Sequence, residues 1–198
     1  MNWYPSQALV QGWLDSWTRL AGRFSQEVSS PTLPSGQVES GTFEISRPDR
    51  MRWDYTSPER KLAVTDGRST WLYLPEDRQV IVGSLESLRR DGAVALLLSG
   101  SLRLEEAFAV GEVVSRDGRL EMALVPRSPS ASISRLDLVA SEAGTILSFT
   151  VHDPAGNSVL WVFRDLRLDP PLPEDRFTFQ VPPGVEVQDL EAMAAPSP

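Results

Sequence analysis

The first part of the chain has its apolar residues at helical spacing. Between Pro5 and Val28 they recur at intervals of three and four, which places them along one side of a helix. The residues of this stripe are Leu9, Trp13, Leu14, Trp17, Leu20, Ala21 and Phe24. A stretch rich in proline, serine and glycine follows from Ser29 to Gly36 and cannot continue a helix. The spacing therefore predicts one long N-terminal helix within residues 1–30, followed by a loop.

From Gly36 onward apolar and polar residues alternate, a period of two that is typical of β-strands. Turn dipeptides separate the runs, which predicts antiparallel hairpins. These dipeptides are Asp66-Gly67, Asp91-Gly92, Asp117-Gly118, Ala143-Gly144 and Ala155-Gly156. The predicted strands are Gln37–Arg47, Arg50–Tyr55, Leu62–Thr65, Ser69–Leu74, Gln79–Gly83, Ala109–Arg116, Arg119–Pro126, Ile133–Ala140, Ile146–Asp153, Ser158–Arg167 and Arg176–Gln180. Eleven strands in succession indicate one large curled sheet.

Two segments, Leu85–Arg90 and Ala93–Leu98, interrupt the strand rhythm. The second is closed by Ser99-Gly100, which predicts a short helix that ends at glycine. We expect residues 188–198 to form a flexible tail. No composition shift marks a domain boundary, so we expect residues 1–198 to form a single domain.

Odd-numbered positions of successive strands are apolar, which predicts one apolar and one polar face of the sheet. These positions include Phe43, Ile45, Met51, Trp53, Tyr55, Trp71, Tyr73, Leu147, Phe149, Val151, Val159, Trp161 and Phe163. Any one of these side chains fits a packed core, and only their number together indicates a cavity. One long helix and one or two short ones give thin cover for such a face. Either the sheet closes and fills with side chains, or it leaves an apolar cavity under a helical lid.

Arg47 shares its parity with Phe43 and Ile45 and should point toward the apolar side. A guanidinium keeps its charge, so it requires acceptors such as the free carbonyls at a helix C-terminus or a carboxylate. In that case Arg47 is a candidate latch between sheet and lid. The alternative is that strand twist before Pro48 turns the side chain out to solvent.

Composition excludes several classes of function. The net charge of −8 and the pI near 4.7 argue against nucleic acid or an anionic membrane surface as partner. The absence of cysteine excludes disulfides and thiolate sites, and the single histidine excludes a multi-histidine metal site. His152 lies opposite in parity to Val151, which predicts a solvent-facing histidine. We therefore expect no catalytic site, no metal and no cofactor.

Several short blocks also occur in order along the chain. They are Phe24-Ser25-Gln26, Gly41-Thr-Phe-Glu-Ile-Ser-Arg-Pro48, Met51-Arg-Trp-Asp-Tyr55, Pro58, Val64-Thr-Asp-Gly-Arg68, Trp71-Leu-Tyr73, Gln79-Val80 and Phe177-Thr-Phe-Gln-Val-Pro-Pro-Gly-Val185. As an ordered set, over about Phe24 to Val187, they resemble the LolA family of outer-membrane lipoprotein carrier proteins. The segment from Ala107 to Val151 has no residue match, so the resemblance there concerns topology only.

The resemblance implies a mainly β fold: an unclosed antiparallel half-barrel of about 11 strands, with an N-terminal helix and short lid helices over an apolar cavity. It implies a monomeric periplasmic carrier, whose signal peptide has been removed, that shields the acyl chains of lipoproteins. Such a carrier takes its cargo from an ATP-driven transporter in the inner membrane. It delivers the cargo to a lipoprotein acceptor in the outer membrane.

The resemblance also assigns roles to residues. The family's arginine before proline falls on Arg47 and holds the lid, with Leu96 and Leu97, closed in the unloaded state. Met51 stands where the family has a cavity aromatic, whereas Trp53 matches directly. The residues expected to bind lipid are Phe43, Ile45, Met51, Trp53, Tyr55, Trp71, Tyr73, Phe149, Val151, Trp161 and Phe163.

Other functions use the same fold. A LolB-like outer-membrane acceptor, a periplasmic stress sensor, and a carrier of other acylated molecules such as glycolipids all remain alternatives. From a different class, a lipid-directed enzyme would have to be built around His152 with Asp153 or a nearby serine. The parity of His152 disfavours that alternative.

Overall fold

The computed structural model describes residues 5–33, 36–86, 88, 97–100, 102–130 and 132–190. The helices are α1 (Pro5–Asp15), α4 (Leu104–Ala107) and the 3-10 helix η1 (Glu174–Phe177). The strands are β1 (Arg19–Ser29), β2 (Val38–Ser46), β3 (Arg50–Ser57), β4 (Lys61–Asp66), β5 (Ser69–Leu74), β6 (Gln79–Ser84), β7 (Phe108–Arg116), β8 (Arg119–Pro126), β9 (Arg135–Ser141), β10 (Ile146–His152), β11 (Ser158–Leu168) and β12 (Glu186–Asp189).

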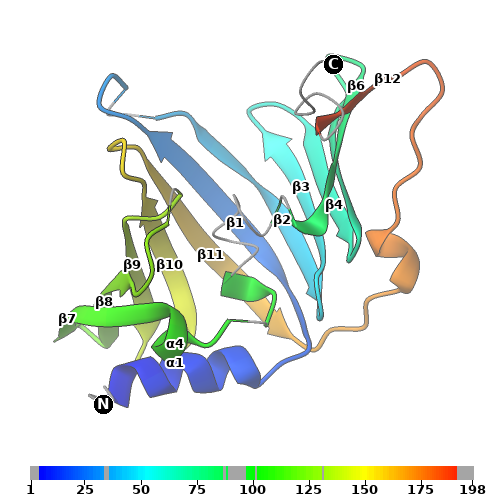
Figure 1. Ribbon diagram of the computed structural model, residues 1–198. Helices are drawn as coiled ribbons and strands as arrows, with labels where there is room; N and C mark the ends of the chain where they lie inside the picture. The colour runs from blue at the N-terminus through cyan, green and yellow to red at the C-terminus, as the bar shows by residue number, and fades with distance from the viewer. Residues whose placement is uncertain are drawn as a thin grey trace.

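All twelve strands belong to one sheet with the order β12-β6-β5-β4-β3-β2-β1-β11-β10-β9-β8-β7. Neighbouring strands run antiparallel, except for β12, which runs parallel to β6. The sheet curls into a half-barrel, and α1 lies across one end of its concave side (Figure 1). The edge strands β12 and β7 do not pair with each other, so the predicted unclosed half-barrel is confirmed.

Ten of the eleven predicted strands are present as β2 to β11, each within two residues of its predicted ends. Four of the turn dipeptides join consecutive strands, and the fifth, Asp91-Gly92, lies outside the described residues. Gly118 and Gly144 adopt φ angles of 72° and 86°, which favour glycine. Of the short helix expected at Ala93–Leu98, Leu97 and Leu98 are helical, and residues 93–96 lie outside the described part of the chain.

The prediction of one long N-terminal helix is wrong beyond Asp15, because the next residues form β1 in the middle of the sheet. Leu20 and Phe24 are four residues apart, a spacing that fits both a helix face and one face of a strand. A Cβ atom at Gly22 would lie only 2.9 Å from the carbonyl oxygen of Arg164. Glycine thus lets β1 approach β11, and hydrogen-bonded pairing on both edges outweighs the helical spacing.

The strand predicted at Arg176–Gln180 is also wrong. These residues form the end of η1 and an extended segment that passes along the outer side of the sheet (Figure 1). Arg176 Nε donates a hydrogen bond to Glu44 Oε2 at 2.8 Å, and Phe177 is buried. Side-chain attachment to the outer face therefore takes the place of strand pairing.

The chain then returns to the sheet as β12, so residues 188 and 189, expected in a flexible tail, are paired with β6. Leu190 is also described, and residues 191–198 of the predicted tail lie outside the described residues.

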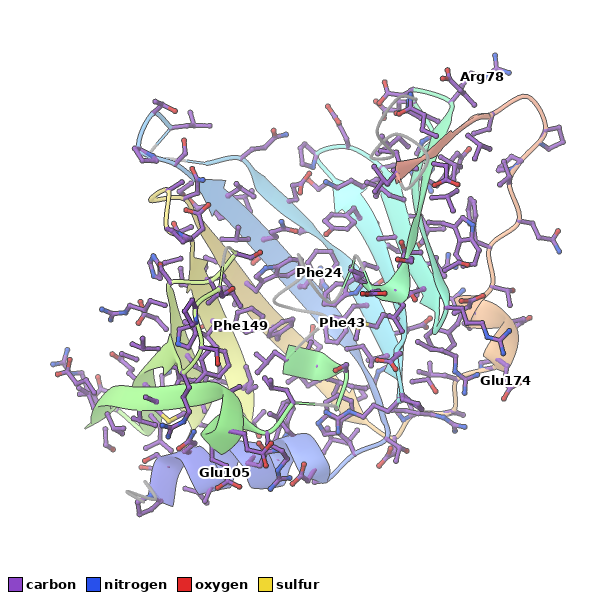
Figure 2. All side chains as sticks on the ribbon, in the orientation of Figure 1. Phe24, Phe43, Arg78, Glu105, Phe149 and Glu174 are labelled. Atoms are coloured by element: carbon purple, nitrogen blue, oxygen red, sulfur yellow. The ribbon has the colours of Figure 1, made fainter. Side chains whose placement is uncertain are left out.

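The main core fills the end of the concavity next to α1. Phe24, Phe43 and Phe149 project into it from the strands (Figure 2). Leu14 and Trp17, each 2% exposed, meet them from the α1 side. Each such side chain contributes roughly 1.5–3 kcal/mol on burial, which fixes α1 over this part of the sheet. No helix in the described ranges is long and apolar enough to cross a bilayer.

Candidate functional site

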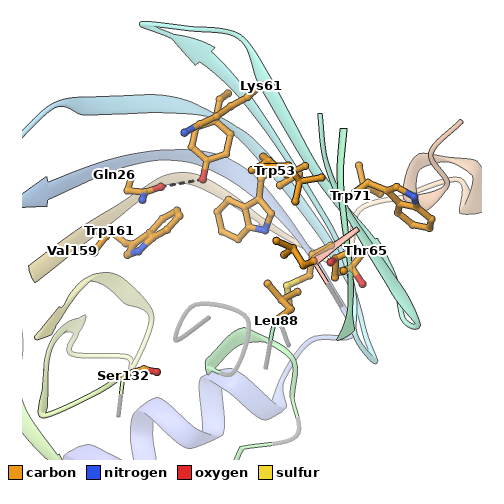
Figure 3. Close-up of a pocket in the computed structure, with 18 of the residues that line it drawn as sticks. Gln26, Trp53, Lys61, Thr65, Trp71, Leu88, Ser132, Val159 and Trp161 are labelled. Atoms are coloured by element: carbon orange, nitrogen blue, oxygen red, sulfur yellow. Dashed lines mark hydrogen bonds between the residues drawn. The ribbon is translucent and has the colours of Figure 1, made fainter. Parts of the chain in front are cut away.

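The concave side of the sheet holds a cleft of about 750 Å³ (Figure 3). This volume lies within the range of roughly 300–1,000 Å³ that is typical of ligand sites. The cleft is lined by Gln26, Met51, Trp53, Tyr55, Lys61, Ala63, Val64, Thr65, Thr70, Trp71, Leu72, Ile81, Gly83, Leu88, Ser132, Val151, Asp153, Asn157, Val159, Trp161 and Leu190. Most of these residues are apolar, so the cleft suits an apolar guest.

Aromatic rings form one wall of the cleft. Trp53 on β3 and Trp161 on β11 lie 5.2 Å apart between ring centroids, and Phe24 on β1 lies 5.0 Å from Trp53. The indoles are only 8% and 9% exposed, and both line the cleft. The antiparallel register across β3, β2, β1 and β11 brings them together. The result is a broad apolar surface on this side of the cleft.

Polar side chains lie beside this wall. Tyr55 donates a hydrogen bond from its hydroxyl to Gln26 Oε1 at 3.0 Å (Figure 3). Lys61 Nζ lies 4.4 Å from the centroid of the Tyr55 ring and 2.5 Å from Glu39 Oε1. Burial, assisted by the Glu39 carboxylate, raises the pKa of the Tyr55 hydroxyl well above its usual value. Tyr55 therefore keeps its proton and remains a donor at neutral pH.

Arg47 follows β2 and reaches the ends of two helical segments. Its Nη1 donates hydrogen bonds to the carbonyl oxygen of Leu14 and to the carbonyl oxygen of Trp17, the latter at 3.1 Å. Its Nε donates a hydrogen bond to the carbonyl oxygen of Leu98 at 3.3 Å. Cζ lies 3.5 Å from the centroid of the Trp17 ring. The structure thus decides between the two alternatives: the side chain points toward the helices and not to solvent.

The guanidinium of Arg47 stays charged in this position. Burial lowers the pKa of Arg47 to about 10, while the carboxylates of Asp15 and Asp169 act in the opposite direction. The group is therefore protonated at neutral pH. It supplies charge-assisted hydrogen bonds to helix-end carbonyls that would otherwise need other donors.

Comparison with known proteins identifies the family. The family model described as outer membrane lipoprotein carrier protein LolA matches residues 15–180. The chain belongs to the LolA family. Among its relatives, the outer-membrane lipoprotein carrier protein of Alkalilimnicola ehrlichii is 35% identical over 184 residues, which cover 92% of this chain and 83% of that protein. The Cupriavidus necator protein of the same name is 32% identical over 169 residues, covering 84% and 79%.

Solved structures agree on the fold of this LolA-family chain. An uncharacterized conserved protein from Thermus thermophilus superposes with a TM-score of 0.57 at 14% identity, covering 93% of this chain and 96% of that one. A DUF1329 family protein from Desulfovibrio piger gives a TM-score of 0.51 at 10% identity, covering 87% and 95%. At these identities the likeness concerns the half-barrel alone.

The structure divides the residues expected to bind lipid in this LolA-family protein. Those that line the cleft are Met51, Trp53, Tyr55, Trp71, Val151 and Trp161. Those packed in the core beneath the helices are Phe43, Ile45, Phe149 and Phe163. Leu97, expected in the lid, is buried in the same core, and Leu96 lies outside the described residues.

The expected orientation of Trp71 and Tyr73 is wrong. Val64 pairs with Trp71 and Leu62 with Tyr73, so odd residues of β5 share the outer face with even residues of β4. The rings of Trp71 and Tyr73 lie 6.3 and 5.6 Å from that of Phe179, which belongs to the outer segment. Trp71 borders the cleft, but its indole points away from it (Figure 3).

The same reversal of parity explains why the sequence analysis missed Leu72 among the lining residues. Ala63 pairs with Leu72, and Leu72 pairs with Ile81, so these three side chains share the concave face. The register of the hairpin between β4 and β5 is the signal that identifies Leu72, whereas Ala63 and Ile81 keep the odd parity of the other inward positions. Leu88 and Leu190 gave no such signal, because their place in the cleft depends on tertiary packing.

His152 lies at the end of β10, next to Val151, which faces the cleft. Its Nε2 is 2.9 Å from Asp137 Oδ2, and its side chain is 37% exposed. Alternation along the strand directs His152 to the outer face. The pair therefore lies on the opposite side of the sheet from the cleft.

Proposed function

We propose that this protein carries lipoproteins through the periplasm by holding their acyl chains in the cleft of its half-barrel. Membership of the LolA family supports the proposal, since its relatives are named as outer-membrane lipoprotein carriers. The observation that carries it is the cleft of about 750 Å³ on the concave face, with Trp53 and Trp161 in its wall.

The physical need for such a carrier follows from the hydrophobic effect. An acyl chain of about 16 carbons gains on the order of 10 kcal/mol on leaving water. Acylated cargo therefore does not cross an aqueous compartment unaided. A wide cleft with apolar walls shields the chains without the precise polar contacts that would make release slow.

The partners that fit this role are an ATP-driven lipoprotein-releasing transporter in the inner membrane and a lipoprotein acceptor in the outer membrane. The carrier must bind the acyl chains tightly enough to keep them out of water. It must also bind them less tightly than the acceptor does, so that delivery can occur. Neither catalysis nor a cofactor is needed, because each step is a transfer between binding sites. The net charge of −8 supports partners other than nucleic acid.

Arg47 acts in this proposal as the latch of the empty carrier. It joins β2 to the end of α1 and to the segment of Leu97 and Leu98. Hydrogen bonds from a charged group are worth about 1.5–3 kcal/mol each. Cargo that displaces the helices must break them, so closure of the latch lowers the net affinity and assists release.

The acyl chains contact two groups of residues in turn. Met51, Trp53, Tyr55, Val151 and Trp161 line the cleft in the closed form. Movement of the helices then uncovers the deeper core residues Phe43, Ile45, Phe149 and Phe163, together with Leu97. The cavity of the loaded carrier is thus larger than the cleft of the empty one.

The test is to purify the protein from a periplasmic extract, extract bound lipid with organic solvent, and identify it by mass spectrometry. We expect acylated peptides or lipoproteins. A fluorescent acyl probe should bind in parallel and be displaced by a synthetic lipopeptide. Absence of bound acyl groups together with failure to bind the probe would overturn the proposal. Recovery of glycolipid alone would show a different acylated cargo.

A further inference from the structure

The chain contains one lysine, and it lies in the wall of the cleft. Lys61 pairs with Tyr55 across β4 and β3, which places both side chains on the concave face. Its Nζ is 2.5 Å from Glu39 Oε1, and the two side chains are 24% and 20% exposed. The positive charge of Lys61 is therefore already matched where it borders the cleft.

Stability alone gives little reason for this ion pair. Taking two charges partly out of water costs desolvation energy that their attraction only roughly repays. Apolar residues would serve equally well for stability in a wall that also includes Trp53, Ala63 and Leu72. The pair is thus a candidate for a functional role in the cleft.

The charges along the cleft disfavour an anionic guest. The charged side chains among the described lining residues are Lys61 and Asp153, and Glu39 forms an ion pair with Lys61. Asn157 donates hydrogen bonds to Asp153 from its backbone and side-chain amides, which lowers the pKa of Asp153 and keeps it ionised. A phosphate or carboxylate head would meet two carboxylates and a lysine that is already paired.

We propose that Glu39 is a specificity-determining residue that, by pairing with Lys61, makes the cleft select acyl ligands with uncharged heads over anionic amphiphiles. The inference rests on the proposed function, since it requires that the cleft takes acyl chains. Ester and amide groups, which join acyl chains to a peptide, can instead hydrogen-bond with the polar groups of Gln26 and Tyr55.

Selection by the head group distinguishes ligands that apolar contact with the acyl chain cannot distinguish. Phospholipids and fatty acids present the same kind of acyl chain as acylated proteins, so burial of the chain gains the same free energy for each. Discrimination requires a difference in affinity at the head group, and a misplaced charge is an effective source of it. The pairing of Glu39 with Lys61 supplies that difference.

The experiment compares Glu39→Gln with Glu44→Gln. Both glutamates lie on β2, both side chains are 20% exposed, and each variant removes one negative charge. Glu44 serves as the control because its partner is Arg176 on the outer face. The probes are palmitoyl lysophosphatidylglycerol and monopalmitoylglycerol, which share the acyl chain and a glycerol ester and differ in the anionic phosphoglycerol group. Affinity is measured by displacement of a fluorescent acyl probe.

In Glu39→Gln the lysine loses its partner and becomes a site for the phosphate. We expect affinity for lysophosphatidylglycerol to rise on the order of tenfold, the effect of about one charge-assisted hydrogen bond. Affinity for monopalmitoylglycerol should not change, and Glu44→Gln should alter neither. The gain should shrink in high salt. Adding Lys61→Met to Glu39→Gln should abolish it, and thermal unfolding checks that each variant is folded.

The outcomes separate the two proposals. Unchanged affinity for lysophosphatidylglycerol in Glu39→Gln, with monopalmitoylglycerol still bound, would overturn the role of Glu39 and leave the carrier proposal intact. An equal gain in Glu44→Gln would show a general effect of net charge and would also overturn it. If the native protein bound neither lipid, the carrier proposal itself would fail, and the selectivity with it.

Discussion

Arg47 and Gly100 are in direct contact: a Cβ atom at position 100 would lie 2.7 Å from both Cδ and Nε of Arg47. Gly100 also adopts a φ of 83°, in the left-handed region that favours glycine. The guanidinium rests on the Trp17 ring as well, with Cζ 3.5 Å from its centroid. Gly100 therefore follows the helical residues Leu97 and Leu98 and leaves the space that Arg47 occupies.

Gly100→Ala should weaken the latch without altering Arg47 itself. The new methyl group must displace the arginine side chain, so the hydrogen bond to Leu98 should lengthen or break. We expect slower dissociation of a bound acyl probe, measured by stopped-flow fluorescence. The control is Gly118→Ala, which has a similar φ of 72° but no atom within 4 Å of the added Cβ. Equal dissociation rates in the two variants would mean that backbone strain alone is responsible.

Arg47→Leu should preserve the fold, increase retention of cargo and slow its delivery. Leucine keeps an apolar contact with Trp17 but cannot donate to the carbonyls, so hydrogen bonds of about 1.5–3 kcal/mol each are lost from the closed state. Retention is measured as probe dissociation, and delivery as transfer of a lipopeptide to acceptor-containing vesicles. Arg50→Leu is the control, because Arg50 faces Glu174 on the outer side at 3.7 Å. Identical transfer kinetics in the native protein and Arg47→Leu would argue against the latch.

The position of Arg47 was one of two alternatives that the sequence left open, because its chemistry is restrictive. A guanidinium that keeps its charge on the apolar side of a strand requires hydrogen-bond acceptors, and the carbonyl groups at the end of a helix are one of the few available kinds. The segment after α1 could not be anticipated in the same way. Leu20 and Phe24 suit a helix and a strand equally, and only the place of β1 between β2 and β11 decides between them.

The concave face of the sheet was predicted correctly where strand parity carries over and wrongly where it reverses. Trp53 and Trp161 were found because alternation continues in phase across the strands that hold them. Between β4 and β5, Thr65 pairs with Thr70, so the inward positions change from odd to even. Local alternation gives the two faces of each strand, but the turn geometry determines how the faces of neighbouring strands match.

This reversal predicts opposite effects for two neighbouring residues of β5. Leu72→Ser should weaken binding of a neutral acyl probe about fivefold, corresponding to a loss of about 1 kcal/mol of apolar contact. Tyr73→Ser should leave that affinity unchanged and lower the unfolding free energy by about 1 kcal/mol, because the ring pair with Phe179 is lost. Titration with the probe and urea unfolding measure the two effects. A larger loss of affinity in Tyr73→Ser would contradict the assigned faces.

Asp169 closes the corner between α1 and β1, and its protonation should weaken that corner. Its Oδ1 accepts hydrogen bonds from the backbone amides of Arg19 and Thr18, at 2.9 Å each, and from the Thr18 hydroxyl at 3.0 Å. These bonds, led by that from Arg19, lower the pKa of Asp169 below the ordinary value of 3.8. A carboxylate with a lowered pKa in the folded state stabilises the protein above its unfolded pKa. That stabilisation is lost as the pH falls through the folded value.

Asp169→Asn should therefore destabilise the protein more at pH 7 than at pH 3, because pH 3 lies below the ordinary pKa of 3.8, where the stabilisation by the carboxylate begins to be lost. Urea unfolding at pH 7, 5 and 3 measures the difference. Asp165→Asn is the matched control, because both aspartates have a positive φ, 48° at Asp169 and 53° at Asp165, which asparagine tolerates. Asp165 instead faces Arg23 at 3.9 Å in an exposed pair, so its replacement should have little effect at any pH. If the destabilisation by Asp169→Asn were the same at all three pH values, shape and not charge would hold the corner together.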